Sequence, residues 1–160
     1  LIDANFRQPE VHRRFGVENA KGFSEILNGS ANLRDCALAS RIPNLSILTT
    51  GSKIANAAEI FESPILSEFI KQALADYDHV VFDSGPMLIA SEAVTLAAKV
   101  DGVILVVRAH VDSRGMLQRA REELKKVGAE NLGVILNAVR ARGGGYYGRS
   151  IKAYYNYQGE

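Results

Sequence analysis

The chain of 160 residues contains no tryptophan, only four prolines and a single cysteine, Cys36. One cysteine excludes an internal disulfide and offers no set of cysteine ligands for a metal, which suits a reducing compartment. No apolar run approaches the roughly 20 residues of a membrane-spanning helix, and no stretch has the pattern of a signal peptide. Neither sign of charge dominates, because 19 basic and 18 acidic residues leave a formal net charge of +1. The overall charge therefore gives no argument for or against a nucleic-acid partner.

The sequence does contain enough apolar residues for one globular domain. Hydrophobic residues make up 47% of the chain and charged residues 23%, which is sufficient to bury a core. The composition changes after residue 140, so we expect an ordered domain over 1–140 and a flexible, Gly- and Tyr-rich C-terminal segment over 141–160. Because the chain begins with Leu1, apparently partway through a strand, we expect it to be a fragment of a longer protein.

The pattern of apolar residues predicts strands that alternate with helices. We expect strands that end at residue 4 and cover 45–50, 80–83, 103–108 and 133–137, with 80–83 and 103–108 buried on both faces. We expect helices over 9–15, 22–27, 31–40, 63–77, 91–99 and 113–127. Ser63 and Ser113 are predicted N-caps, Gly128 a predicted C-cap and Met116 a core residue. This alternation predicts an α/β fold with a doubly wound, mainly parallel sheet and helices on both faces.

Two aspartates follow predicted strands. Asp3 ends the first strand, and Asp83 leads from the strand VVFD into a Ser-Gly-Pro turn. In parallel α/β sheets, ligands bind outside the carboxyl ends of the strands, so acids placed there can hold a metal ion or its bound water. Asp83 could equally close the turn or cap the next helix, since aspartate is common in both positions.

Tyrosine is concentrated near the C-terminus. From Arg140 onward the chain holds five of the six tyrosines, together with four basic residues and five glycines. Aromatic residues interleaved with Arg and Lys could stack on single-stranded nucleic acid. The segment could also be a low-complexity tail without function, or its tyrosines could accept phosphate.

The order of several motifs resembles the bacterial tyrosine kinases. LIDANFRQP resembles the family's second Walker motif (A-prime), VVFDSGP resembles Walker B, and GFSEILNG, NLSILTTG and NAAEIF lie between them in the family's order. These kinases are the capsular and exopolysaccharide autokinases, which share the P-loop NTPase-like fold with partitioning and cell-division ATPases. The tyrosine-rich C-terminal segment is similar to the family's autophosphorylated tail.

The resemblance implies ATP and Mg²⁺ as cofactors and gives roles to particular residues. Asp3 would accept the proton of a tyrosine hydroxyl or hold the metal shell, and Asp83 would hold Mg²⁺ through water. Arg7 would orient phosphate or a neighbouring subunit, unless it forms a surface salt bridge. Asn137 would contact the adenine ring, unless it is a turn residue. The implied phosphate acceptors are Tyr146, Tyr147, Tyr154, Tyr155 and Tyr157.

Two departures from the family pattern bear on activity. The family usually has a second acid where this chain has Asn5, and no G-x-x-x-x-G-K-[ST] occurs anywhere in the sequence. Without those backbone amides and that lysine, the β- and γ-phosphates of ATP have no cradle. We therefore expect the first strand and the P-loop to lie upstream of Leu1, and this polypeptide alone to be inactive toward ATP.

The resemblance leads to a specific expectation for the intact protein. It would be a tyrosine autokinase that phosphorylates C-terminal tyrosines and regulates exopolysaccharide or capsule synthesis and export. It would act in the cytoplasm at the inner face of the membrane, as a homo-oligomer, with a membrane-embedded chain-length regulator as partner and no nucleic acid. The alternatives are a partitioning-type P-loop ATPase and a non-catalytic binding module with the ATPase fold.

Overall fold

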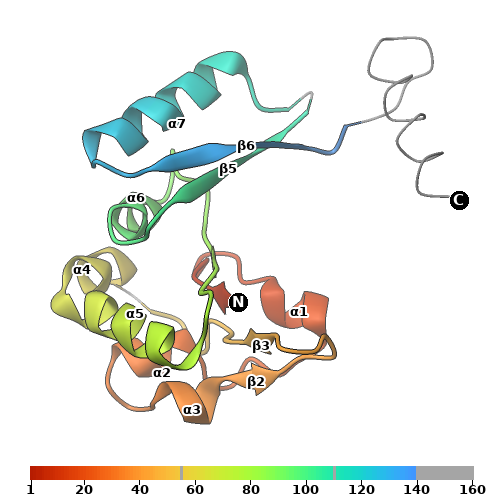
Figure 1. Ribbon diagram of the computed structural model, residues 1–160, viewed down its shortest axis with the longest axis vertical. Coiled ribbons are helices and arrows are strands. Elements are labelled where there is room, and N and C mark those ends of the chain that lie inside the picture. Colours follow the sequence, from red (N-terminus) through yellow and green to blue (C-terminus); the bar gives the residue numbers. More distant parts are fainter. Residues whose placement is uncertain (55, 110, 140–160) are drawn as a thin grey trace, which may run out of the picture.

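The computed structural model describes residues 1–54, 56–109 and 111–139 (Figure 1). Its elements in chain order are β1 (Ile2–Asp3), α1 (Val11–Phe15), α2 (Phe23–Leu27), α3 (Leu33–Cys36), β2 (Leu38–Ala39), β3 (Ser46–Ile47), α4 (Ala57–Glu62), α5 (Pro64–Asp76), β4 (Phe82–Asp83), α6 (Ser91–Ala97), β5 (Val103–Arg108), α7 (Arg114–Lys126) and β6 (Asn131–Asn137). The predicted C-terminal segment lies outside the described residues, so the boundary at residue 140 stays a prediction. Among the helices of the described ranges, none combines the length and apolar character needed to cross a membrane.

Most strand pairs are parallel, as the alternation of elements predicts. β1 lies parallel to β4, with Ile2 opposite Phe82 and Asp3 opposite Asp83. Leu48, just after β3, forms a parallel bridge with Ile2, so β1 lies between the β3 region and β4. β5 and β6 form a second parallel pair, whereas β2 and β3 form a short antiparallel one. Helices connect the parallel strands, α5 between β3 and β4 and α7 between β5 and β6, as in a doubly wound fold.

A cluster of phenylalanine rings forms the centre of the core. Phe23 of α2 is fully buried, and its ring centroid lies 4.8–6.0 Å from those of Phe6, Phe61, Phe69 and Phe82. These rings come from β4, from three helices and from the loop after β1, so their contacts hold α2, α4 and α5 against the two central strands. Burial of one such ring stabilises the fold by about 1.5–3 kcal/mol. The cluster thereby fixes the loops that leave the carboxyl ends of β1 and β4.

Local helix signals in the sequence are largely confirmed. The Ser63 hydroxyl accepts a hydrogen bond from the Ile65 N–H at the start of α5, and the Ser113 hydroxyl accepts one from the Met116 N–H at the start of α7. Gly128 follows α7 with φ +69°, a left-handed conformation that favours glycine.

Two predictions of local structure are wrong. The helix expected over 31–40 is limited to α3, because Leu38 and Ala39 pair with β3 as a short strand. The helix α4 is absent from the predicted elements. Ser63 has extended backbone with ψ 163°, which separates α4 from α5, so α4 is an additional helix before the predicted one over 63–77.

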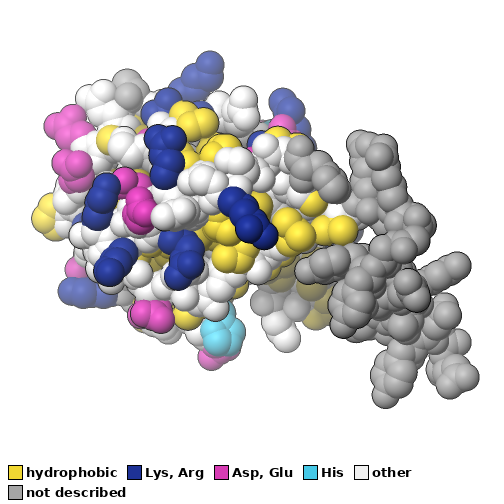
Figure 2. All heavy atoms as spheres, turned by 90° about the horizontal axis from the view of Figure 1, so that it is seen from above, with side chains coloured by type: hydrophobic (Ala, Val, Ile, Leu, Met, Phe, Trp, Pro, Cys, Tyr) yellow, Lys and Arg dark blue, Asp and Glu magenta, His cyan; other side chains and the backbone are white. Residues whose placement is uncertain are grey.

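The strands predicted to be buried on both faces are covered on one side only. Val81, Ile104 and Val106 are 58%, 53% and 59% exposed, and Leu132, Val134 and Leu136 of β6 are also exposed. No third strand of the described residues pairs with β5 and β6, and α7 runs along this pair in Figure 1. Met116, predicted to be core, is 41% exposed, because α7 buries Ala120 and Leu124 instead. Figure 2 shows hydrophobic side chains at the surface among scattered Lys and Arg side chains.

Candidate functional site

The carboxyl ends of β1 and β4 bring the two predicted acids side by side. Asp3 and Asp83 are direct partners in the parallel register. The Asp3 N–H donates to the Leu48 carbonyl, and the Ala4 N–H donates to the Asp83 carbonyl, both at 2.8 Å. Because parallel strands end at the same edge of a sheet, two acids far apart in the chain meet at one place.

Asp3 is fully enclosed, and its carboxylate binds the loop that follows it. The residue is 0% exposed. Oδ1 accepts a hydrogen bond from the Asn5 N–H, and Oδ2 accepts from the N–H groups of Glu10 and Val11, each at 3.1 Å. The side chain of Glu10, at the N-cap position of α1, forms no capping hydrogen bond. The Asp3 carboxylate, which precedes the helix in the chain, accepts hydrogen bonds from its first amides instead. In this structure Asp3 therefore holds the loop between β1 and α1 in place.

Asp83 is the acid of this pair that reaches solvent. It is exposed at the end of β4, next to Ser84 and Gly85. Partial desolvation of the carboxyl and, after it, the negative charge of Asp3 raise the pKa of Asp83 above its ordinary value. An aspartate whose ionisation is opposed in this way is typical of a functional position, because the fold gains nothing from its charge.

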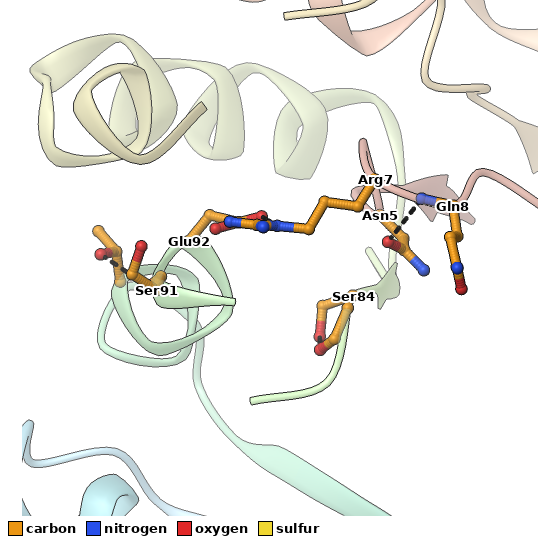
Figure 3. Close-up of polar contacts among 8 residues, drawn as sticks. Asn5, Arg7, Gln8, Ser84, Ser91 and Glu92 are labelled. Atoms are coloured by element: carbon orange, nitrogen blue, oxygen red, sulfur yellow. Dashed lines mark hydrogen bonds and ion pairs between the residues drawn. The ribbon is translucent and has the colours of Figure 1, made fainter. Parts of the chain in front are cut away.

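Asn5 joins the two loops at this edge. Its Oδ1 accepts a hydrogen bond from the Gln8 N–H at 3.2 Å, which closes the turn after β1 (Figure 3). The same oxygen lies 3.3 Å from the position that a Cβ on Gly85 would occupy. The side-chain oxygen of Asn5 thus stabilises the turn, and an aspartate at position 5 would offer an equivalent acceptor oxygen.

Arg7 forms an ion pair with a residue that sequence reasoning missed, Glu92. The Arg7 Nε donates to Glu92 Oε1 at 3.0 Å and so links the loop after β1 to α6 (Figure 3). Pairing with Glu92 raises the pKa of Arg7. Burial by itself would raise the pKa of Glu92, but the hydrogen bond from Arg7 and the backbone hydrogen bond outweigh it and lower that pKa. The salt bridge of Arg7 is therefore present, and its role in orienting phosphate or a neighbouring subunit stays a prediction.

Asn137 is separate from this group of residues. It ends β6, where its Oδ1 accepts from the Ala138 N–H at 2.7 Å, and it stands opposite Arg108 in the β5–β6 register. No hydrogen bond or ion pair within the described ranges joins it to Asp3, Asp83 or Arg7. The predicted phosphate acceptors (Tyr146, Tyr147, Tyr154, Tyr155 and Tyr157) lie outside the described residues.

Known proteins share this arrangement of elements. No protein-family model matches the chain. Among curated proteins, tyrosine-protein kinase YwqD of Bacillus subtilis is 33% identical over 151 residues, which cover 92% of this chain and 64% of YwqD. Among solved structures, the VpsO kinase domain is 33% identical with a TM-score of 0.81, over 87% of this chain and 69% of that domain. The chain belongs to the bacterial tyrosine kinases.

Membership in this kinase family confirms the resemblance and the fold class. The kinase domain of Escherichia coli tyrosine kinase ETK superposes with a TM-score of 0.80 at 27% identity, over 91% of this chain and 59% of that one. A MinD protein of Pyrococcus horikoshii superposes with a TM-score of 0.65 at 22% identity, which shows the shared P-loop ATPase fold alone. The chain spans 64% of the length of YwqD and 22% of tyrosine-protein kinase wzc of Salmonella typhi.

The acids at this edge of the sheet fit Mg²⁺ at one position. No group of three or more His, Cys, Asp or Glu side chains converges within the described ranges. Mg²⁺ bound next to substrate phosphates needs only one or two carboxylates, since it keeps several waters. Both Asp3 oxygens already accept backbone hydrogen bonds, whereas the Asp83 carboxylate is exposed and repelled by Asp3. A cation would relieve that repulsion, so Asp83 is the side chain suited to hold it.

Proposed function

We propose that the intact protein transfers the γ-phosphoryl group of ATP to tyrosines of the C-terminal segment. The observation that carries this proposal is the exposed Asp83, its pKa raised beside Asp3, at the carboxyl edge of a bacterial tyrosine kinase fold. In such a transfer the phenolic oxygen bonds to the γ-phosphorus, and the bond to the departing ADP breaks. The phenolic proton passes to the exposed carboxylate of Asp83, because a phenol with a pKa near 10 is a poor nucleophile unaided.

The two acids divide the work in this proposal. Asp83 would hold Mg²⁺ through water, and the ion would neutralise charge on the phosphates when bound. Asp3 is enclosed by backbone amides, so it acts by fixing the loop that carries Asn5 and Arg7. Arg7 is paired with Glu92 and still largely exposed, and it would bind phosphate or a neighbouring subunit. Asn137 remains the proposed contact of the adenine ring, on the separate β5–β6 pair.

The sheet has room for the phosphate-binding loop that the sequence lacks. Among the described residues, no further strand pairs with β5 and β6, and apolar side chains of both strands are exposed. Parallel sheets are normally covered on both faces, because their connections place helices there. We therefore assign to the intact kinase a further strand with its P-loop, which would complete the sheet and cradle the phosphates. The 160-residue chain alone is then expected not to turn over ATP.

The cellular role follows from the family. Relatives at 27–33% identity have tyrosine-protein kinase in their names, among them YwqD, wzc, CapB and CpsD. By this kinship the intact protein would regulate capsule or exopolysaccharide synthesis and export at the inner face of the membrane. Its partner would be a membrane-embedded chain-length regulator, and the C-terminal segment of one copy would reach the site of another copy in a homo-oligomer.

Mass spectrometry tests the proposed activity directly. The intact protein is incubated with ATP and Mg²⁺, beside an Asp83→Ala control, and its peptides are analysed. Phosphate on tyrosines of 146–157 that is absent from the control supports the autokinase. An unmodified segment, in a protein that binds ATP, would instead favour a partitioning-type ATPase, with which the chain shares its fold.

A further inference from the structure

Three basic side chains form a stripe along one side of α7. Arg114, Arg121 and Lys125 follow one another at intervals of seven and four residues, which places them on the same side of an α-helix. All three are exposed. The stripe is about 16 Å long, because each helical residue adds about 1.5 Å. Figure 2 looks onto the α7 side of the molecule and shows Lys and Arg side chains projecting from it. We call these three residues the basic stripe.

The acids of α7 do not neutralise the basic stripe. Glu123 pairs with Lys126 at 2.7 Å, and Glu122 accepts a hydrogen bond from Gln118 at 3.2 Å. No ion pair among the described residues involves a cation of the stripe. The helix packs on the rest of the fold through its buried apolar residues, so these charges do not hold it in place. The stripe therefore offers three positive charges to a ligand outside the described part of the chain.

The C-terminal segment begins close to this stripe. β5 and β6 are parallel and end at one edge, where the Ala109 N–H donates to the Asn137 carbonyl at 2.8 Å. Arg114 follows Ala109 by five residues, which span at most about 18 Å. Tyr146 follows Asn137 by nine residues, which span at most about 30 Å, and the later tyrosines have a longer reach. The tyrosines of the segment can therefore reach the stripe of their own chain.

Phosphorylation reverses the charge of the C-terminal segment. From Arg140 onward the segment has four basic side chains and one acidic side chain, so the stripe repels it while its tyrosines are unmodified. Each phosphotyrosine adds about −1.5 to −2 charges at pH 7, together with three acceptor oxygens. Three phosphates are then enough to make the segment acidic. Arginine is well suited to such a group, because its guanidinium can donate two parallel hydrogen bonds to phosphate oxygens.

We propose that the basic stripe is a docking site for phosphotyrosines of the chain's own C-terminal segment. After phosphate transfer, the segment folds back from β6 over α7, and the phosphate oxygens accept hydrogen bonds from the stripe. An anionic lipid surface would meet the same charges, but the tethered segment has a millimolar effective concentration there. Docking withdraws the modified segment from further transfer. This inference rests on the proposed kinase function and adds what becomes of its product.

A synthetic peptide tests the docking site separately from the kinase function. The peptide has the sequence of residues 140–160, is phosphorylated on its five tyrosines and is labelled for fluorescence polarisation. It is titrated into the intact protein with Asp83→Ala, whose own segment stays unmodified. The salt concentration is about 0.15 M, at which charges more than about 8 Å apart are largely screened. Because the phosphates are synthetic, binding does not depend on the protein being a kinase.

Two matched double variants distinguish the stripe from the net charge of α7. Arg121→Gln with Lys125→Gln removes one arginine and one lysine from the stripe, whereas Arg119→Gln with Lys126→Gln removes the same charges from the other exposed flank. Glutamine is a good helix former, so α7 is retained. The stripe pair should weaken phosphopeptide binding about tenfold or more, and the flank pair about twofold or less. If the stripe pair fails to fold, Arg114→Gln alone should weaken binding about fivefold.

Several results would overturn the docking site. Equal losses in the two double variants would show that the peptide follows net charge alone, and equal affinity for the unphosphorylated peptide would remove the role of the phosphates. Vesicles containing phosphatidylglycerol that bind through the stripe, when the phosphopeptide does not, would assign it to a lipid surface instead.

A second measurement tests docking within one chain. The intact protein, once it has phosphorylated itself, should bind the added peptide about tenfold more weakly than the Asp83→Ala form, because its own segment occupies the stripe. Equal binding by the two forms would overturn docking within the chain. Failure of the protein to phosphorylate itself would refute the kinase function and would leave the result with the synthetic peptide standing.

Discussion

Replacement of Asp3 should destabilise the protein far more than replacement of Asp83, although sequence motifs give the two acids similar roles. Asp3 is 0% exposed and its carboxylate accepts three backbone hydrogen bonds. Asp83 is exposed and its ionisation is opposed by Asp3. The same edge of the sheet therefore contains one acid on which the fold depends and one on which it does not.

The magnitude follows from the contacts of the Asp3 carboxylate. A hydrogen bond to a charged acceptor contributes about 1.5–3 kcal/mol, and these values do not add fully when one oxygen is shared. Removal of the side chain also leaves the buried N–H of Val11 and the partly buried N–H of Glu10 without a partner. We expect Asp3→Ala to lower the free energy of unfolding by about 3–4 kcal/mol, a large part of the roughly 5–15 kcal/mol of a typical domain. Asp3→Asn, which keeps one acceptor oxygen, should lower it by about half as much.

Urea unfolding at pH 7, followed by far-UV circular dichroism, gives the required comparison. Wild type, Asp3→Ala, Asp3→Asn and Asp83→Ala are unfolded under identical conditions, and the free energies are extrapolated to water. The expected order of stability places Asp83→Ala at or above wild type, then Asp3→Asn, then Asp3→Ala. If Asp3→Ala lies within about 1 kcal/mol of wild type, the structural role given to its three hydrogen bonds is refuted.

Three further predictions follow from the same geometry. Because the pKa of Asp83 is raised in the folded state, its ionisation costs stability as the pH rises from the ordinary aspartate value of about 4 through the raised one. Asp83→Asn should therefore have a higher melting temperature than wild type at pH 7 and the same melting temperature as wild type near pH 3. A higher melting temperature of wild type at pH 7 would contradict the raised pKa of Asp83. Asn5→Asp keeps an acceptor for the Gln8 N–H and restores the acid of the family pattern, so kinase assays of the intact protein should show higher activity and a lower Mg²⁺ requirement. Phe23→Ala, at the centre of the ring cluster, should cost about 3–5 kcal/mol in chemical unfolding, and a cost below about 1 kcal/mol would show that the cluster does not hold the loops.

Local signals in the sequence predicted those parts that depend on neighbours in the chain. The strand 103–108, the caps Ser63 and Ser113 and the left-handed Gly128 all depend on residues within one or two turns, and the structure confirms them. The wrong predictions share another cause. Residues 38–39 leave the predicted helix because they pair with β3, and α4 packs on α6 rather than continuing into α5. Pairing and packing of that kind involve segments that no local pattern connects.

The sequence by itself determined that Asp3 and Asp83 end strands of an α/β fold, because the end of a strand depends on apolar and turn residues within a few positions of it. Only the tertiary structure decided what each acid does there. Asp3 is enclosed because the amides of Glu10 and Val11 fold back onto it, and Asp83 is exposed because no further described strand covers β4. The pairing of Arg7 with Glu92 spans 85 positions of the chain, so neither residue's surroundings in the sequence could indicate it. Burial and charge pairing are set by contacts across the fold, and they separate the two aspartates that the motif treats alike.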